Sequence, residues 1–321
     1  MRIAFLSDTH LTIVRGRLWP GPKHRASLRA FLKQALERKK RIDRVVLLGD
    51  IFDTWRTPPH VVPPSYEEIV DRHRDLLACM ARLAASDRLV YVLGNHDFDV
   101  PRGLLRERMP GATVIGPGSG GSHRFWVDEC KLFAVHGHQY SRFNNVSRRA
   151  DQLEGYPIGY YIGRLHAGLQ EGRGAMSFGQ LYAYTQKLNS VIRRRQGTFE
   201  ALVDSVRGNA RWVRLDSNRN VAISEIRAFA RAMGERYPPV TTALSAVAER
   251  TLSLAASRAS FFRGARTVVF GHTHFPMLNE PRRHRWFSRT YANAGCWCRG
   301  QPHYVVADTQ RKTLRLISFA D

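Results

Sequence analysis

The stretch TVVFGHTHFP, residues 267–276, is a short apolar run that ends at a glycine and continues into two histidines one residue apart. A run of apolar and β-branched residues closed by glycine predicts a buried strand over 267–270. His272 and His274 would then follow the carboxyl end of that strand. Alone, the pair fits two interpretations equally well: polar side chains that close a strand, or two ligands whose rings turn toward a common centre.

The same arrangement, an apolar run followed by Asp, Asn or His, recurs at four other places. The runs are 2–7, 44–48, 89–93 and 131–135, and the polar groups at their ends are Asp8-Thr9-His10, Gly49-Asp50-Ile51-Phe52-Asp53, Gly94-Asn95-His96-Asp97 and His136-Gly137-His138. Each motif by itself is an ordinary strand-end turn. Open α/β sheets place ligands outside the carboxyl ends of their strands, so the recurrence favours one shared crevice. Carboxylate, amide and imidazole donors together suit Mn, Fe or Zn better than Mg or Ca alone.

Helical periodicity separates the predicted strands. Apolar residues spaced by three and four predict a helix over 27–40, and a second helix over 65–85 opens with the capping-box pair Ser65 and Glu68. Further strands are predicted at 113–115, 125–127, 304–307 and 313–319, with 125–127 and 131–135 forming a hairpin. Alternating strands and helices predict an α/β sandwich with parallel strands at its centre.

The pattern changes between residues 143 and 263. Strand-like alternation stops, and helices are predicted at 180–193, 198–206, 222–233 and 242–256. The simplest organisation is a layered α/β domain divided by a helical insertion. The insertion contains the aromatic, glycine-rich run 156–165 and three consecutive arginines at 193–195. Apolar faces with basic edges fit a membrane interface, but the same apolar residues also fit packing within the insertion.

Charge and cysteine content set the expected partners and location. The chain has 321 residues, with 50 Lys and Arg against 27 Asp and Glu, a net charge of +23. Such a surface attracts polyanions, either nucleic acid or an anionic membrane leaflet; an arginine-rich composition without a binding role is the alternative. The four cysteines show no secreted disulfide spacing, and Cys296-Trp297-Cys298 alone does not make a zinc site. With no leader and no apolar run of about 18 residues, we expect a cytoplasmic protein, with peripheral contact at the inner face of the membrane as an extension.

Taken in order, the motifs Asp8-x-His10, Gly49-Asp50-x-x-Asp53, Gly94-Asn95-His96-Asp97, His136 and Gly271-His272-x-His274 resemble those of the calcineurin-like metallophosphoesterases. The resemblance implies an α/β fold, a layered β-sandwich flanked by helices with a large helical insertion, around two divalent metal ions. Residues 1–142 and 264–321 would form the catalytic domain. Residues 143–263 would form a lid or a membrane- or substrate-binding cap.

The resemblance also implies a role for each matching residue. Three residues would bind the first metal ion: Asp8, His10 and His274. Three would bind the second: Asn95, His136, for which His138 is the alternative, and His272. Asp50 would bridge both ions, His96 would protonate the leaving oxygen, and Asp97 would fix the tautomer of His96. Mn is the expected metal, with Fe or Zn as alternatives.

Within this superfamily, the stretches GDIFDTW at 49–55, Asp97-Phe98 and GHTHFP at 271–276 are similar to the UDP-2,3-diacylglucosamine pyrophosphatase branch. That similarity implies hydrolysis of a nucleotide-lipid pyrophosphate in lipid A synthesis, by in-line attack of a metal-bridging hydroxide. The helical insertion would cap the acyl chains. The better-known members of the branch carry Arg at the position of His96 and have a shorter insertion.

Two other functions stay open. A metal-dependent nuclease or nucleotide phosphodiesterase would apply the same centre to nucleic acid, in line with the positive charge. A non-catalytic binding protein would need only a structural metal, and the His96-Asp97 pair argues against it. The expected partners are an anionic phosphoester substrate, an anionic membrane surface and, as the alternative, nucleic acid. No obligate protein partner is expected.

Overall fold

The structure is a computed structural model that describes residues 1–14, 17–37, 41–116, 124–170, 199–237, 264–279 and 290–320. The chain divides into two compact units. The first comprises Met1–Asp53, Ser65–Gly137 and Ser253–Asp321, and the second comprises Thr54–Pro64 and His138–Leu252. The domain boundaries at 142 and 264 stay a prediction, and the helices predicted at 180–193 and 242–256 lie outside the described residues.

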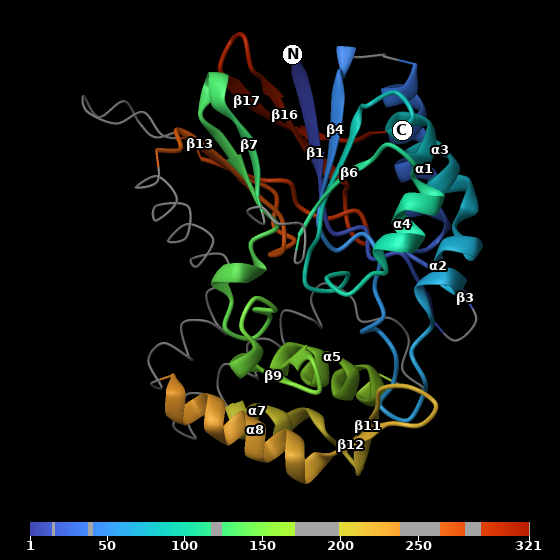
Figure 1. Cartoon of the computed structure of the whole chain (residues 1–321), viewed down its shortest axis with the longest axis vertical. Coiled ribbons are helices and arrows are strands. Elements are labelled where there is room, and N and C mark those ends of the chain that lie inside the picture. The colour runs from blue at the N-terminus through green and yellow to red at the C-terminus, as the bar shows by residue number, and fades with distance from the viewer. Residues whose placement is uncertain are drawn as a thin grey trace. The chain divides into compact units, whose positions relative to one another are not determined.

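A six-stranded sheet forms the centre of the first unit (Figure 1). Its strands, in spatial order, are β17 (Thr313–Ser318), β16 (His303–Asp308), β1 (Arg2–Leu6), β4 (Arg44–Leu48), β5 (Leu89–Val92) and β6 (Thr113–Ile115). Strands β1, β4, β5 and β6 run parallel, and β16 joins β1 antiparallel. The carboxyl ends of β1, β4 and β5 therefore open on the same edge of the sheet.

A five-stranded sheet packs against one face of the first sheet. Its strands, in spatial order, are β14 (Met277–Asn279), β15 (Thr290–Asn293), β13 (Thr267–Phe270), β8 (Leu132–Ala134) and β7 (Phe125–Val127). Strand β13 runs parallel to both β8 and β15, and β7 and β8 form the predicted hairpin. Alternate residues of the two sheets share one core, for example Phe5 and Val46 with Val269.

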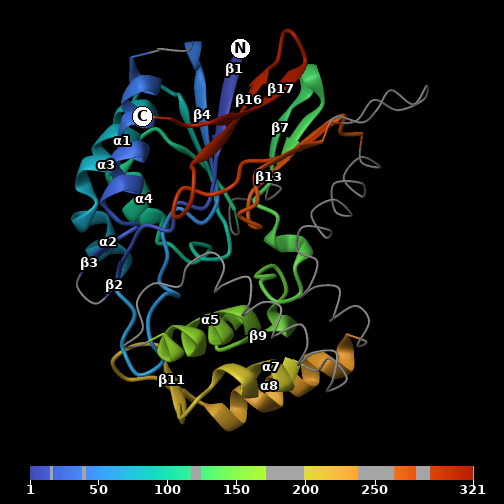
Figure 2. The same cartoon turned by 180° about the vertical axis from the view of Figure 1, so that it is seen from behind.

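Helices cover the opposite face of the six-stranded sheet, as the reverse view in Figure 2 also shows. They are α1 (Pro22–Leu36), α2 (Tyr66–Arg72), α3 (Arg74–Ala84) and α4 (Arg102–Arg108). The strand residues that point away from the sheet-to-sheet core, such as Leu6 and Leu47, pack there against Leu28 and Phe31 of α1. Period-two alternation in the strands and period-3.6 spacing in the helix explain this layering. The predicted layered sandwich with flanking helices is confirmed.

The helix predicted over 65–85 is two helices, α2 and α3, which meet at His73. The capping box of Ser65 and Glu68 is present as predicted. At His73 the backbone leaves helical geometry, with φ −109° and ψ 24°. The buried imidazole Nε2 lies 3.1 Å from the carbonyl oxygen of Thr12, at the start of the small ribbon of β2 (Thr12–Val14) and β3 (Arg17–Trp19). A tertiary contact therefore accompanies the break that local periodicity does not reveal.

The described residues of the second unit form three helices, α5 (Ile158–Leu169), α7 (Phe199–Val206) and α8 (Ile223–Arg236), which pack around an apolar core. The same residues also form two antiparallel pairs of short strands that the sequence did not predict. The pairs are β9 (Gln152–Leu153) with β10 (Tyr156–Pro157), and β11 (Trp212–Arg214) with β12 (Asn220–Ala222). Strands of two or three residues are too short to show alternation. In the part of the chain that the structure describes, no helix has the length and apolar character to cross a membrane.

Arg164 of α5 is fully buried in the second unit. Its guanidinium donates hydrogen bonds to the Tyr160 hydroxyl and to four backbone carbonyl oxygens: those of Thr57, Pro58, Val61 and Arg214. Guanidinium has five N–H donors, so each one has an acceptor. Arg164 thereby holds the segment Thr54–Pro64 against α5 and β11.

Candidate metal centre

The predicted site residues follow the carboxyl ends of five strands, and the structure brings their side chains together in the first unit. Among the described residues, three groups of possible metal donors have atoms that all lie within 4.8 Å of one another. The groups are His10, Asp50 and His96; Asp50, His136 and His272; and His10, His274 and Cys298. Asp50 belongs to two of these groups, and so does His10.

The distances between donors describe two neighbouring clusters. In the first, His274 Nε2 lies 3.0 Å from Asp8 Oδ1 and 3.0 Å from His10 Nε2. In the second, His136 Nε2 lies 3.1 Å from Asp50 Oδ2, while its Nδ1 lies 2.8 Å from the carbonyl oxygen of Leu48. The Leu48 contact fixes the ring so that Nε2 faces the centre. His138, the alternative to His136, belongs to none of the donor groups found in the described part of the chain.

The backbone at this centre adopts an unusual conformation. Five of the predicted ligands have left-handed φ angles: Asp8 at 57°, His10 at 47°, Asp50 at 53°, His272 at 69° and His274 at 61°. This conformation costs a non-glycine residue about 1–3 kcal/mol and persists only where the surroundings enforce it. Clustered strain of this kind is typical of functional sites and aims successive side chains in directions that a regular strand would not.

Three glycines make room for this arrangement. A Cβ atom on Gly49, whose φ is +85°, would lie 2.5 Å from Cγ of His136. A Cβ on Gly94 would collide with Asp50, and one on Gly271 would collide with Ser7. Each glycine immediately precedes a predicted ligand, so its missing side chain lets two strand ends approach closely.

The side chain of Asn95 bears on whether a cation fits this centre. Its side chain is fully buried, and neither Oδ1 nor Nδ2 has a hydrogen-bond partner within the described structure. Leaving a buried polar group unsatisfied costs about 1–3 kcal/mol, so such a group calls for an explanation. A divalent cation would accept the amide oxygen as a ligand. The donor set of carboxylates, imidazoles and one amide therefore fits divalent metal ions.

The electrostatics of the cluster also favour added positive charge. Burial alone lowers the pKa of His10, but hydrogen bonds to Asp53 and Asp8 outweigh it and raise that pKa to about 10. Burial likewise lowers the pKa of His136, but the negative charge of Asp50 raises it to about 9. The pKa of Asp50 is lowered despite its burial, because the nearby His136 and His96 favour its charged form. Metal ligands must be deprotonated, so bound cations would take the place of these protons.

Asp53 has a larger part in the site than the sequence indicated. Its carboxylate is buried and joins two imidazoles: His10 Nδ1 lies 2.8 Å from Oδ2, and His96 Nδ1 lies 2.9 Å from Oδ1. The prediction that Asp97 orients His96 therefore needs correction, since Asp53 occupies that position. The Gly-Asp-x-x-Asp spacing that ends in Asp53 was the available signal. It marks the residue, but does not show which histidines it contacts.

Asp97 instead ties strand ends together. It accepts hydrogen bonds from the backbone N–H of Gly94 at 2.7 Å, from that of Ile51 at 2.6 Å and from the hydroxyl of Tyr91 at 2.5 Å. Burial and the neighbouring charge of Asp50 raise the pKa of Asp97 to about 6. Its contacts connect the turns after β4 and β5, which carry Asp50 and Asn95. Asp97 is therefore a positioning residue for the centre.

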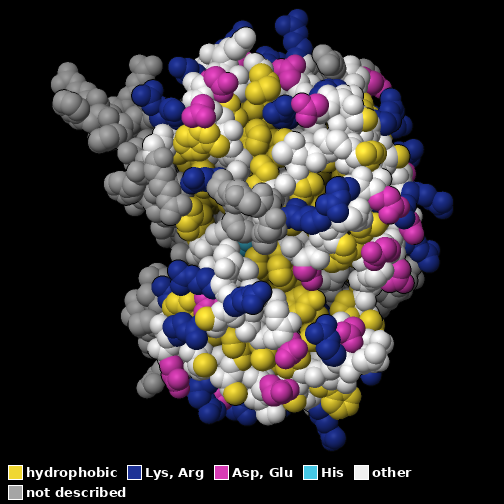
Figure 3. Space-filling view, in the orientation of Figure 1, with side chains coloured by type: hydrophobic (Ala, Val, Ile, Leu, Met, Phe, Trp, Pro, Cys, Tyr) yellow, Lys and Arg dark blue, Asp and Glu magenta, His cyan; other side chains and the backbone are white. Residues whose placement is uncertain are grey.

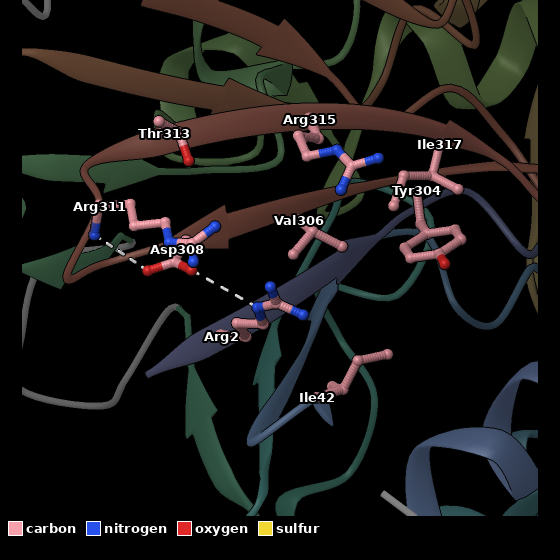
Figure 4. Close-up of a pocket in the computed structure, with 9 residues that line it drawn as sticks. All are labelled: Arg2, Ile42, Tyr304, Val306, Asp308, Arg311, Thr313, Arg315 and Ile317. Atoms are coloured by element: carbon pink, nitrogen blue, oxygen red, sulfur yellow. Dashed lines mark hydrogen bonds and ion pairs between the residues drawn. The ribbon is translucent and has the colours of Figure 1, made fainter. Parts of the chain in front are cut away.

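The first unit also has a pocket of about 410 Å³ that lies apart from the candidate ligands (Figure 4). Strands β1, β16 and β17 line it, with Arg2 and Asp308 joined across it at 3.5 Å. Arg2 begins β1, whereas Asp8 follows the other end of the same strand. Neither the predicted ligands nor His96 line this pocket, so we assign no catalytic part to it.

Comparison with known proteins finds one family and several similar solved structures. The family model for calcineurin-like phosphoesterases matches residues 1–276. Matching solved structures include a dimetal phosphatase from Danio rerio, with 16% identity over 100% of this chain and 99% of that one at a TM-score of 0.43. A novel archaeal phosphodiesterase matches with 13% identity over 99% of both chains at a TM-score of 0.38. A metallophosphoesterase from Sphaerobacter thermophilus matches with 12% identity over 100% of this chain and 89% of that one at 0.37.

No curated protein matches the chain. The family match includes every strand-end motif from Asp8 to His274, together with the five strands that carry them: β1, β4, β5, β8 and β13. The grouped Asp and His donors agree with the use of divalent metals in that family. The chain belongs to the calcineurin-like phosphoesterase family and is a metal-dependent phosphoester hydrolase.

Proposed function

We propose that the chain hydrolyses a phosphodiester or pyrophosphate bond at two divalent ions that share Asp50. The observation that carries the proposal is the position of Asp50 in two donor groups, one with His10 and His96 and one with His136 and His272. A carboxylate has two oxygens and can serve two ions. When bound, such ions lower the pKa of a water molecule and neutralise charge on the phosphoryl oxygens.

The remaining ligands divide between the two ions. Asp8, His10 and His274 would hold one ion, and Asn95, His136 and His272 would hold the other. The backbone N–H of His272 donates to Asp8 Oδ2 at 2.9 Å, so the two sets are mechanically linked. Mn is the metal we propose for the pair, with Fe and Zn as alternatives.

His96 is the proposed proton donor to the leaving oxygen. Its backbone N–H donates to Asp50 Oδ1 at 2.9 Å, and Asp53 holds its Nδ1. Its Nε2 lies 3.8 Å from Asp50 Oδ2, so this nitrogen faces the centre. With Nδ1 fixed by a carboxylate, the Nε2 proton is the one available for transfer.

Hydrolysis of bis-p-nitrophenyl phosphate tests the hydrolase proposal. Metal-stripped protein should be inactive, and reloading with Mn, Fe or Zn should restore turnover. The His96→Ala variant should keep its metal and lose about 100-fold in rate, the scale of general acid catalysis. His166→Ala is the matched control, because His166 lies in α5 of the second unit and belongs to none of the donor groups found among the described residues. Full activity in the stripped protein would overturn the proposal.

A nucleotide-lipid pyrophosphate resembling UDP-2,3-diacylglucosamine is the substrate we propose. The branch-like motifs support it, and so do three exposed apolar residues of the second unit, Val61, Val62 and Trp212. Arg164 holds the Val61 carbonyl, and the Arg214 N–H donates to the Pro59 carbonyl at 2.7 Å, so these apolar residues sit on connected segments. Tryptophan beside aliphatic and basic residues suits the surface of an anionic bilayer. The proposed location is therefore the cytoplasmic face of the membrane.

Release of UMP from UDP-2,3-diacylglucosamine by the Mn-loaded protein tests the substrate. Acyl-chain recognition predicts much slower release from the same nucleotide sugar without its acyl chains. Equal rates on both compounds would contradict a lipid substrate while leaving the hydrolase proposal intact. If the protein releases no UMP but still hydrolyses bis-p-nitrophenyl phosphate, the lipid substrate is likewise contradicted and the hydrolase proposal stands.

Nucleic acid is the second candidate substrate, and the net charge of +23 favours it. Lys and Arg side chains are spread widely over the face shown in Figure 3 and are interspersed with acidic ones. Metal-dependent cleavage of single-stranded DNA, with an affinity that falls steeply as salt rises, would favour this substrate over the lipid.

A further inference from the structure

The sulfur atom of Cys298 lies beside the first of the two donor clusters, the one that contains His10 and His274. Its Sγ belongs to the donor group with His10 and His274, whose atoms all lie within 4.8 Å of one another. Cys298 is 3% exposed and His10 is 5% exposed, whereas His274 is partly exposed. Cys298 lies beyond residues 1–276, the part of the chain that the family model matches. The family match therefore assigns this residue no part in the site.

The neighbouring Trp297 fixes the position of Cys298. The Trp297 backbone N–H donates to the carbonyl oxygen of Asp8 at 3.1 Å, which ties this turn directly to the end of β1. Its indole Nε1 donates to the His303 carbonyl at 2.7 Å, and its ring lies 5.2 Å from that of Phe31 in the apolar core. A fully buried tryptophan held at three points leaves the next residue little freedom. The approach of Cys298 to the cluster is thus built into the fold.

Cys296 differs from Cys298 although both are buried. The Cys296 thiol donates to the carbonyl oxygen of Arg299 at 3.6 Å, and its side chain also has hydrogen bonds to His274 and Cys298. It belongs to none of the donor groups found among the described residues. Cys296 is therefore the second sulfur beside the cluster, and a variant of each cysteine shows which of the two sulfurs binds the metal.

We propose that Cys298 is a thiolate ligand of the metal ion held by Asp8, His10 and His274, and that it makes this position selective for Zn²⁺ or Fe²⁺. Thiolates are soft donors that favour Zn and Fe, whereas Mn prefers oxygen donors. The second set, Asn95, His136 and His272 with Asp50, contains no sulfur. The two positions then prefer different metal ions, and the centre would hold two different metals. The inference rests on the proposed two-metal centre and adds a fourth ligand to the ion held by Asp8, His10 and His274.

Cobalt substitution tests this assignment. Co²⁺ in the wild-type protein should show visible d–d bands together with a near-ultraviolet thiolate-to-cobalt charge-transfer band. The Cys298→Ser variant should retain the d–d bands and lose the charge-transfer band, and Cys296→Ser should retain both. A charge-transfer band that survives Cys298→Ser, or disappears in Cys296→Ser alone, would overturn the assignment.

Metal competition gives a second result. Cys298→Ser should weaken Zn²⁺ binding about 10-fold or more, on the scale known for changes around metal ligands, and leave Mn²⁺ binding nearly unchanged. An equal loss for both ions would contradict the proposed selectivity.

X-ray absorption of the zinc-loaded wild-type protein needs no variant and covers the case in which Cys298→Ser fails to fold. A sulfur neighbour at about 2.3 Å from zinc is expected. A shell of nitrogen and oxygen alone would refute a cysteine ligand but leave the two-metal hydrolase standing. Failure of the wild-type protein to bind any divalent ion would instead refute the proposed function itself.

Discussion

Each compact unit buries charged side chains, but the two units satisfy them differently. Arg164 in the second unit gives every guanidinium N–H to an oxygen acceptor. In the first unit, buried Asp8, Asp50 and Asp53 face a group of imidazoles, and Asn95 has no hydrogen-bond partner in the described structure. The first unit also holds five predicted ligands in left-handed backbone conformations.

This difference in hydrogen bonding distinguishes a buried polar group that stabilises the fold from one that serves a function. A buried charge whose hydrogen bonds are all made holds segments together and requires nothing further. A buried group that lacks a partner, on a strained backbone, destabilises the protein unless a ligand completes it. We therefore expect changes at Arg164 to act on stability, and changes at the metal centre to act on metal binding and rate.

The largest effect is expected for Asp50→Asn. Loss of the shared carboxylate removes a negative charge from both metal positions, and metal stabilisation of the transition state is worth several kcal/mol. Turnover of bis-p-nitrophenyl phosphate should fall by about 1000-fold or more, with a lower metal content by elemental analysis. Folding should be preserved, because the side chain keeps its shape. Unchanged turnover would show that Asp50 does not join the two donor groups.

Arg164→Ala should have the next largest effect, on stability. Four carbonyl oxygens and the Tyr160 hydroxyl lose their donor, so the unfolding free energy should fall by about 3 kcal/mol or more. Urea denaturation measures the loss. Arg227→Ala is the control, because that arginine is partly exposed and its ion pairs with Glu200 and Asp204 are worth about 1 kcal/mol at most. Equal losses in both variants would contradict the structural part given to Arg164.

Asp53→Asn should weaken metal binding about 10- to 100-fold, since the carboxylate that orients His10 is lost. The rate with saturating metal should fall as well, because His96 loses the same partner. Asp97→Asn is the comparison, with a smaller effect on rate, since Asp97 contacts neither histidine among the hydrogen bonds of the described residues. Metal titration and turnover in the two variants distinguish the role of Asp53 from that of Asp97. A greater loss in Asp97→Asn would restore the original prediction for His96.

The smallest effect is expected at His73. Burial lowers the pKa of His73 below its unfolded value of about 6.5, although the Thr12 carbonyl partly opposes the shift. The neutral form therefore contributes stability that is fully present above the unfolded pKa and is lost as pH falls below it. The loss should not exceed about 1.4 kcal/mol per pH unit and should be absent in His73→Gln. Identical acid dependence in both proteins, measured by denaturation between pH 7 and pH 5, would contradict this account.

Much of the fold follows from local sequence, because apolar runs closed by glycine are strong strand signals. The predicted strands at 44–48 and 267–270 have the bounds of β4 and β13. The predicted helix over 27–40 appears as α1, which begins at Pro22 and ends at Leu36. A proline in the first turn suits a helix start but adds nothing to the apolar periodicity. The periodicity therefore did not predict the start of α1 at Pro22.

The features that the sequence did not reveal depend on contacts between distant segments. Asp97 is adjacent to His96 in sequence, yet the carboxylate on the ring belongs to Asp53, more than forty residues earlier. Cys298 looked isolated because its approach to His274 depends on the contact of Trp297 with Asp8. Sequence spacing identified which residue types gather, but not which side chains pair within the group.

Anomalous diffraction from crystals loaded with divalent metal tests the central claim most directly. We predict two metal peaks in the first unit: one in contact with Asp8, His10 and His274, and one in contact with Asn95, His136 and His272. Asp50 should contact both. A single peak, or two peaks that do not share Asp50, would contradict the two-metal centre.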